Sequence, residues 1–142
     1  MPVFEYTTEF PCSVERLWAF HERPDVIRLL TPPLTPVQIV RQAGGLEPGA
    51  EKEFLLGVWP LRIRWLARHV EYEHARLFAD LQVAGPFRHW LHWHIFAPAA
   101  QGSRLTDRVT YDFPGGALVD WLVRWQLRRL FRHRHAVTAR LA

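Results

Sequence analysis

Residues 104–142 read RLTDRVTYDFPGGALVDWLVRWQLRRLFRHRHAVTARLA. The first part of this stretch alternates two kinds of side chain, with arginine and threonine at even positions and leucine, aspartate, valine and tyrosine at odd positions. A period of two is typical of a strand with one wet face. The ProGlyGly run at 114–116 ends the strand. Residues 117–142 then repeat apolar side chains every three or four positions, which predicts one long helix.

Strand signals also dominate the chain before residue 104. Strands are predicted over residues 2–10, 37–41, 51–59, 61–72, 77–83 and 89–96. Two short helices are expected between the first two strands, and the TPPLTP run at 31–36 cannot continue them, because proline lacks the amide donor. The order predicts an α+β fold, in which a curved antiparallel sheet of about six to seven strands wraps a long C-terminal helix. A sheet bent around one helix often leaves an apolar cavity between them.

The composition favours a folded, soluble protein. With 49% apolar and 23% charged residues in a chain of 142, we expect a single domain over residues 1–142 with its own core. The single cysteine, Cys12, excludes an internal disulfide framework and is compatible with a cytoplasmic location. Neither a signal peptide nor a transmembrane helix is expected, because the chain opens with an alternating acidic stretch and has no apolar run of membrane length.

The positive charge is concentrated at the C-terminal end. Residues 117–142 contain six arginines and one acid, Asp120, whereas the rest of the chain carries a balance of −1 against a net charge of +4. A basic patch can attract the phosphates of nucleic acid or of a membrane surface. However, Lys52 is the only lysine, so the arginines also reflect a compositional bias. A solvated helix face without a nucleic-acid partner is the favoured interpretation.

Several local motifs resemble those of a known superfamily. They are Phe10–Pro11, LeuThrProPro at 30–33, PheAlaAspLeuGln at 78–82, GlyProPhe at 85–87, the alternating Trp90, His92, His94 and Phe96, and then Leu105, Asp107, Tyr111 and Pro114. On these residues the chain resembles the helix-grip (SRPBCC) superfamily, which includes START domains, the major birch-pollen allergen and polyketide cyclases. It is most similar to a bacterial branch described as ligand-binding or cyclase-like. The resemblance spans residues 3–135 and implies the helix-grip fold.

The resemblance also implies a function class and a partner. Members of the superfamily bind lipids, sterols, hormones or aromatic polyketides, and some are enzymes, so the fold alone does not decide the chemistry. Some relatives in the similar branch are joined to a sugar-nucleotide-epimerase-like domain. Because no dinucleotide fingerprint occurs in this sequence, such an epimerase-like partner would be a separate chain.

Strand alternation predicts which side chains face the cavity. Arg62, Arg64 and Arg68 must face water, which turns Ile63, Trp65 and Ala67 inward. By the same alternation Leu105, Asp107, Val109 and Tyr111 face inward, and Phe78, Asp80 and Gln82 share one face. Periodicity leaves both faces of residues 89–96 open, and the resemblance favours Trp90, His92, His94 and Phe96 as the inner set.

The long helix is expected to cover the cavity with its tryptophans. Its apolar stripe contains Leu118, Trp121, Leu122, Trp125, Leu130 and Phe131, whereas Arg124, Arg128, Arg132 and His135 take the opposite face. The predicted ligand-binding residues are therefore Trp65, Phe78, Asp80, Gln82, Trp90, His92, His94, Phe96, Asp107, Tyr111, Trp121 and Trp125.

Three interpretations of the inner polar residues stay open. Asp80 and Asp107 could accept hydrogen bonds from His92, His94 and Tyr111 in a purely structural network. The same groups could orient the polar end of a small apolar ligand, such as a lipid, an isoprenoid or an aromatic polyketide-like molecule. Alternatively, His92, His94, Asp107 and Tyr111 could catalyse a cyclase- or dehydratase-type reaction by acid–base chemistry.

Other ligands and partners are less favoured. His92 and His94 have the spacing of a strand metal site, but such pairs arise by chance in a chain with eight histidines, so neither a metal nor another cofactor is predicted. A different class of function is an accessory module that docks an acidic partner through Arg124, Arg128, Arg132 and Arg134. A monomer or a homodimer is expected.

Overall fold

The computed structural model describes residues 1–33, 36–57 and 60–142. Its elements are β1 (Val3–Phe10), α1 (Val14–His21), α2 (Val26–Leu30), β2 (Val37–Ala43), β3 (Glu51–Leu56), β4 (Ile63–Glu73), β5 (Leu77–Ala84), β6 (His89–Ala99), β7 (Gly102–Asp112) and α3 (Gly116–Leu141). The seven strands form one antiparallel sheet in the order β1-β7-β6-β5-β4-β3-β2. The α+β prediction is confirmed. Parts of two predicted segments, TPPLTP and the strand over 51–59, lie outside the described residues.

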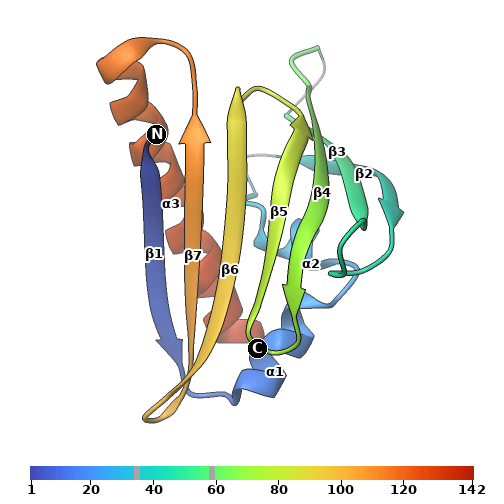
Figure 1. Ribbon diagram of the computed structural model, residues 1–142, viewed down its shortest axis with the longest axis vertical. Helices are drawn as coiled ribbons and strands as arrows, with labels where there is room; N and C mark the ends of the chain where they lie inside the picture. Colours follow the sequence, from blue (N-terminus) through green and yellow to red (C-terminus); the bar gives the residue numbers. More distant parts are fainter. Residues whose placement is uncertain (34–35, 58–59) are drawn as a thin grey trace.

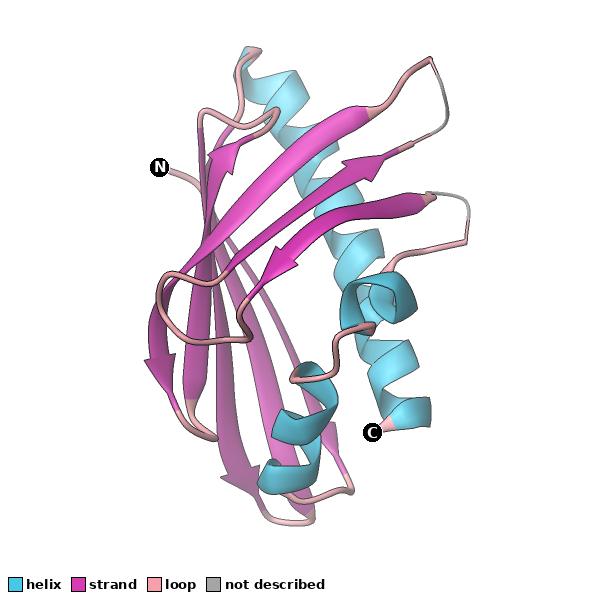
Figure 2. Cartoon of the chain, turned by 90° about the vertical axis from the view of Figure 1, so that its right-hand side faces the viewer, coloured by secondary structure: helices cyan, strands magenta, loops and turns pink. Residues whose placement is uncertain are grey.

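The sheet curves around the long helix. Figure 1 shows α3 running behind β1, β7 and β6, and Figure 2 shows the sheet bending around one side of α3 with the two short helices near its lower end. Register shifts interrupt the β2–β3 and β4–β5 ladders, and such bulges sharpen the bend of a sheet. No helix in the described ranges is long and apolar enough to cross a membrane.

Helix α1 closes one end of the sheet. The Ser13 hydroxyl caps it by accepting a hydrogen bond from the Arg16 amide at 3.2 Å. Its apolar face buries Leu17 and Trp18 completely, and the Trp18 ring packs edge-on against the Phe96 ring with centroids 4.9 Å apart. This aromatic packing makes a solid core at the α1 end of the sheet.

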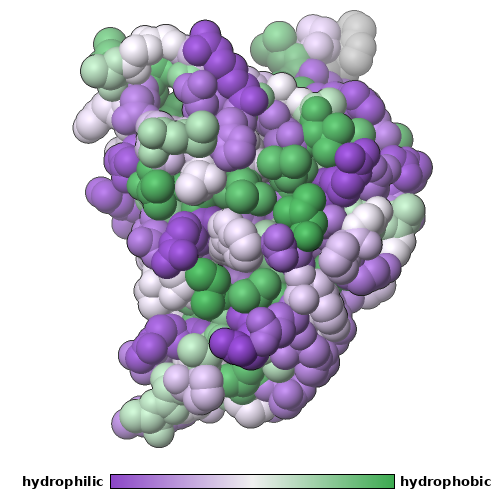
Figure 3. All heavy atoms as spheres, in the orientation of Figure 1, coloured by the Kyte–Doolittle hydropathy of each residue, from purple (hydrophilic) through white to green (hydrophobic). Residues whose placement is uncertain are grey.

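Strand alternation orients the sheet as predicted for β6 and β7. Trp90, His92 and Phe96 are buried on β6, as are Leu105 and Asp107 on β7. The outer face mixes hydrophilic and hydrophobic side chains, as expected for a wet sheet surface (Figure 3). The inner assignment of β4 is also correct from its third residue onward, but Ile63, at the very start of the strand, is 48% exposed.

The predicted inner face of α3 is correct for Leu130 and Phe131 but wrong for Leu118, Trp121, Leu122 and Trp125. Trp121 and Trp125 are 60% and 47% exposed, and the buried residues are Leu127, Phe131, His135, Val137 and Thr138. The rotation of the helix follows from polar contacts that the apolar pattern does not show. His135 faces the sheet, where its Nε2 lies 2.6 Å from Asp107 Oδ2 and its Nδ1 lies 2.7 Å from Thr8 Oγ1.

We therefore expect the two faces of α3 to respond differently to truncation. Phe131→Ala should lower the free energy of unfolding by about 3 to 5 kcal/mol, because it leaves a cavity in the core. Trp121→Ala should change it by less than about 1 kcal/mol, because that ring is mostly in water. Urea denaturation of both variants measures the difference. Equal losses would contradict the helix orientation described here.

Candidate functional site

A cavity of about 590 Å³ lies between the inner face of the sheet and helices α2 and α3. Aromatic and aliphatic side chains from strands β3, β4 and β6 and from α3 form much of its wall, among them Phe54, Trp65, Trp90, Leu127 and Leu130. Polar side chains also line it, namely His21, Thr31, Lys52, His69, Asp80, His92, His94, Gln126, Arg129, His133 and Arg134. A cavity of this size and composition suits a small, mostly apolar ligand with a polar group.

The polar side of the cavity is organised by the Asp107 carboxylate. Its Oδ1 accepts hydrogen bonds from His92 Nε2 at 2.7 Å and from His94 Nδ1 at 3.2 Å, and its Oδ2 accepts one from His135 Nε2 at 2.6 Å. His94 also donates from Nε2 to Asp80 Oδ2 at 2.9 Å. The network therefore joins β5, β6 and β7 to α3.

His94 carries the positive charge of this network. Burial alone would lower its pKa, but the hydrogen bonds to Asp107 and Asp80 outweigh burial and raise the pKa above its ordinary value. Burial would likewise raise the pKa of Asp80 and of Asp107, yet the hydrogen bonds from histidine lower both. The two carboxylates are thus ionised and are partly neutralised by His94.

His92 differs from its neighbour. Burial and the positive charge of His94 lower its pKa, so the ring is neutral near pH 7. Since Nε2–H donates to Asp107, the proton of the neutral ring is on Nε2 and Nδ1 holds a free lone pair. The ring lines the cavity, so it is the member of the network suited to accept a hydrogen bond or a proton from a ligand.

Two further histidines on the cavity wall are also neutral. Burial lowers the pKa of His21 and of His69 to about 4. His21 Nδ1 lies 2.9 Å from the Leu17 carbonyl oxygen, whereas His69 Nδ1 has no partner among the described residues. The His69 ring stacks on Phe78, with centroids 5.6 Å apart, so it behaves mainly as an aromatic part of the wall.

Half of the predicted ligand-binding residues line the cavity. These are Trp65, Phe78, Asp80, Trp90, His92 and His94. Asp107 is buried behind the two histidines and acts through them. Gln82 instead bonds the Phe87 backbone, at 2.7 Å from Nε2 to the carbonyl oxygen, and Phe96 belongs to the core against Trp18.

The other predictions for the site need correction. Trp121 and Trp125 do not line the cavity, because α3 turns that face to solvent. Tyr111 is buried away from it and donates a hydrogen bond to Asp120 at 2.8 Å, and burial followed by that bond raises its pKa to about 12. Tyr111 is therefore not placed to act as an acid on a bound molecule.

Sequence reasoning missed the cationic residues of the cavity. Lys52 falls at an alternating position between Glu51 and Glu53, so the pattern of its strand could have placed it inside. Arg134 was assigned to a solvated basic face, but it lines the cavity next to His133. No sequence signal distinguishes Arg134 from its neighbours, because α3 is rotated by the contacts of His135.

A metal ion would have to compete with the network. Asp80, His92 and His94 each offer one ligand atom, and these atoms lie within 4.8 Å of one another. However, His94 uses both ring nitrogens for the carboxylates, and His92 uses Nε2. Binding a metal would break at least one of these hydrogen bonds, so the donor set fits the observed network better than a metal centre.

Comparisons with known proteins place the chain in a family. The model of the family described as "Polyketide cyclase / dehydrase and lipid transport" matches residues 10–136. No curated protein matches the chain in sequence.

Solved structures show the same fold at low sequence identity. Protein Ms6760 from Mycobacterium smegmatis is 16% identical, with a TM-score of 0.76 over 98% of this chain and 89% of that one. Ara h 8.0201 is 18% identical, with a TM-score of 0.68 over 96% and 97%. A nucleoside-diphosphate sugar epimerase from Corynebacterium glutamicum is 24% identical, with a TM-score of 0.75 over 96% of this chain but only 28% of its own.

The neutral histidines predict that stability falls in mild acid. The pKa of His21 and of His69 is about 4 in the folded chain and about 6.5 in the unfolded chain, so unfolding takes up protons between these values. Their contribution is complete above the unfolded pKa and is lost as the pH falls towards 4. His92, whose pKa is also lowered, adds to this loss. His94, whose pKa is raised, offsets part of it as the pH falls through the unfolded pKa, because the folded chain holds that proton more tightly than the unfolded chain.

We expect each of these two histidines to lower the free energy of unfolding by about 2 kcal/mol between about pH 7.5 and pH 5. Urea denaturation at the two pH values measures the loss. His21→Phe should reduce the loss by about 2 kcal/mol, the share of His21 itself, whereas His74→Gln, which changes an exposed histidine, should leave it unchanged. A loss that is the same in all three proteins would show that His21 is not the source.

Proposed function

Because the chain belongs to the family of polyketide cyclases, dehydrases and lipid transport proteins, we propose that it binds a small, mostly apolar molecule inside its cavity. The observation that carries the proposal is the cavity of about 590 Å³ between the sheet and α3. Water in such an apolar space is readily displaced by a ligand, which gains the free energy of burying its own apolar surface.

The apolar and the polar side of the cavity would together orient the ligand. The apolar body would lie against the aromatic rings of Phe54, Trp65 and Trp90. Trp65 and Trp90 pack edge-to-face with centroids 5.1 Å apart, which presents a rigid surface to a flat or branched hydrocarbon. An oxygen group of the ligand would reach His92, whose Nδ1 is free of partners in the Asp107 network. Lipid, isoprenoid and aromatic polyketide-like molecules all fit this description.

Acid–base catalysis is the second candidate function. It is favoured by one observation, the 2.7 Å hydrogen bond by which Asp107 holds the cavity-lining His92 in its Nε2–H tautomer. In that state Nδ1 could take a proton from the carbon beside a ligand carbonyl, while the electron pair of the C–H bond moves onto the carbonyl oxygen as an enolate. Enolisation of this kind is a step that cyclisation and dehydration of a ketone share.

An epimerase-like partner stays a prediction. The likeness to part of an epimerase chain from Corynebacterium glutamicum supports the idea that this fold works beside such an enzyme. The cytoplasmic location and the monomeric or homodimeric state are also predictions.

Native mass spectrometry tests the binding proposal most broadly. The mass of the native protein is compared with the mass of the denatured protein. A small organic adduct that is released on denaturation would identify the class of ligand. A metal-sized adduct would instead point to Asp80, His92 and His94 as ligands.

A matched pair of variants tests the location of binding. Leu130 lines the cavity, whereas Leu122, on the same helix, is 46% exposed and does not line it. Leu130→Trp should weaken the binding of N-phenylnaphthylamine about tenfold or more, because the larger ring fills the cavity, and Leu122→Trp should leave it within about twofold. Fluorescence titration measures both. Equal affinities, or no saturable binding by the parent protein, would contradict the proposal.

The catalytic candidate is tested by proton exchange in heavy water. The protein should speed the loss of the hydrogens beside the carbonyl of methyl nonyl ketone, as followed by NMR, and His92→Gln should reduce that rate about a hundredfold, since the base is lost. His74→Gln, which changes an exposed histidine outside the cavity, serves as the control and should keep the rate. No acceleration by the parent protein would leave ligand binding as the sole proposed function.

A further inference from the structure

We infer that the cavity selects molecules that carry a carboxylate or another negatively charged group, and that Arg134 and Lys52 receive that charge. The inference rests on the proposed binding function and names its ligand class, an amphipathic organic anion.

Arg134 is a cation inside the cavity without a partner. It lies on α3 and lines the cavity, and its Nε is buried without a hydrogen bond to any described residue. The ion pairs found within the described ranges do not include it. Its guanidinium carbon lies 5.3 Å from the centre of the Phe131 ring, over the ring face. A partly buried guanidinium without an ion pair is suited to receive a carboxylate or a phosphate, and a ligand could supply that group.

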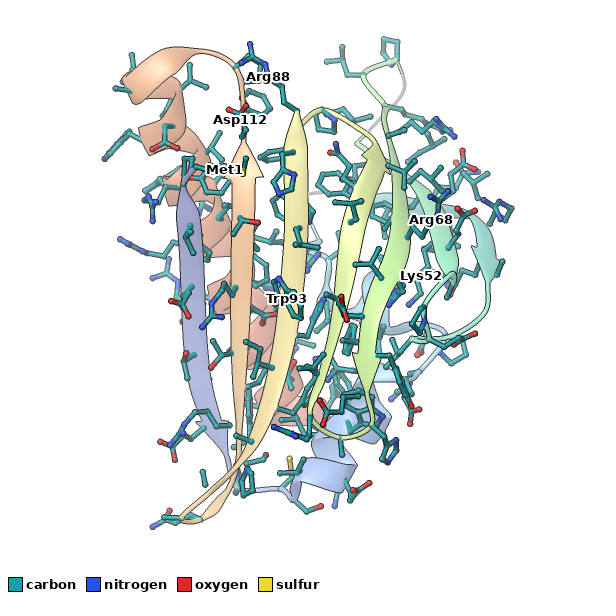
Figure 4. The ribbon with its side chains drawn as sticks, in the orientation of Figure 1. Met1, Lys52, Arg68, Arg88, Trp93 and Asp112 are labelled. Atoms are coloured by element: carbon teal, nitrogen blue, oxygen red, sulfur yellow. The ribbon has the colours of Figure 1, made fainter. Side chains whose placement is uncertain are left out.

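Lys52 is the second such cation. It is the only lysine of the chain, it is 9% exposed, and it lines the cavity from β3. Figure 4 shows Lys52 and Arg68 on the neighbouring strands β3 and β4. No carboxylate of the described residues pairs with Lys52 within 4.0 Å.

The neighbours of Lys52 on β3 show why its lack of an ion pair is informative. The residues on either side of it, Glu51 and Glu53, face outward and pair with Arg68 at 2.8 Å and with Arg64 at 2.7 Å. The outward-facing Glu51 and Glu53 therefore have ion-pair partners, although water alone could solvate them. The buried ammonium group of Lys52 has no such partner among the described residues. Packing for stability alone would favour the reverse arrangement, which points to a binding role for Lys52.

The carboxylates near the cavity are already engaged. Asp107 accepts from His92, His94 and His135, and Asp80 accepts from His94. Of the ionised groups at the cavity, Arg129, Arg134, Lys52 and His94 are positive, whereas Asp80 and Asp107 are negative. The site therefore holds an excess of positive charge, which an anionic group of a ligand would offset.

The excess charge is costly when the cavity is empty. Burial lowers the pKa of Lys52 and the pKa of Arg134, because both ions have lost much of their hydration without gaining a close counter-ion. A bound anion would restore that stabilisation, so its binding should be stronger than that of an uncharged molecule of the same shape. The aromatic wall would hold the apolar part of the ligand at the same time.

Two dyes that differ by one charge test the inference. Anilinonaphthalene sulfonate carries a sulfonate that N-phenylnaphthylamine lacks, and the rest of the two molecules is the same. We expect the sulfonate to bind the parent protein about tenfold more tightly or better than the uncharged dye. Arg134→Met and Lys52→Met should each remove most of this preference while leaving the affinity for the uncharged dye within about twofold.

Control variants separate the cavity from the rest of α3. Arg132→Met removes an exposed arginine of the same helix and should keep the preference, because solvent and salt screen that charge. Trp125→Ala should also keep it, since that exposed ring lies outside the cavity. Thermal unfolding of each variant confirms that the fold is intact, and the Lys52 variant serves as the test if the Arg134 variant does not fold.

The outcomes distinguish this inference from the proposed function. If neither dye binds saturably, both the proposed function and the inference are overturned. If both dyes bind equally, or if Arg132→Met acts like Arg134→Met, the cavity binds ligands but the charge selectivity is overturned. A preference for the sulfonate dye that only the Arg134 and Lys52 variants lose supports both the proposed function and the inference.

Discussion

The carboxylate of Asp107 is the contact on which the rest of the structure depends. It lies in the middle of β7 and accepts hydrogen bonds from two histidines of β6 and from His135 of α3. The bond from His135, at 2.6 Å, determines which face of the long helix meets the sheet. That rotation buries Leu127 and Phe131, turns Trp121 outward and brings Arg134 to the cavity. One buried acid thus couples the packing of the helix to the chemistry of the cavity.

The same network gives the cavity two chemically different sides. Its histidines take the close hydrogen bonds to Asp80 and Asp107, and neither acid forms an ion pair with Lys52 or Arg134 among the described residues. The aromatic side chains of Trp65 and Trp90 form part of the apolar side of the cavity. A protein that leaves buried or partly buried cations without ion pairs beside an apolar space loses stability, and such losses are typically found at functional sites.

Much of the fold could be predicted from local patterns, and the site only in part. Alternation on β7 places Asp107 inward because its neighbours Arg108 and Thr106 need water, and the resemblance to the helix-grip superfamily resolves the ambiguity of β6 in favour of His92. The face of α3 could not be predicted, because the helix has apolar residues on two sides and the deciding contacts come from His135 and the distant Thr8. Arg134 was missed for the same reason. Which polar residue is buried depends on partners far away in sequence, and helical periodicity does not show them.

A crystal structure of the protein with anilinonaphthalene sulfonate tests the central claim most directly. The account predicts the naphthalene ring inside the cavity against Trp65 and Trp90, with the sulfonate within hydrogen-bond distance of Arg134 or Lys52 and the Asp107 network intact. A dye bound instead on the outer face of α3 at Trp121 and Trp125, with the cavity free of it, would contradict the account.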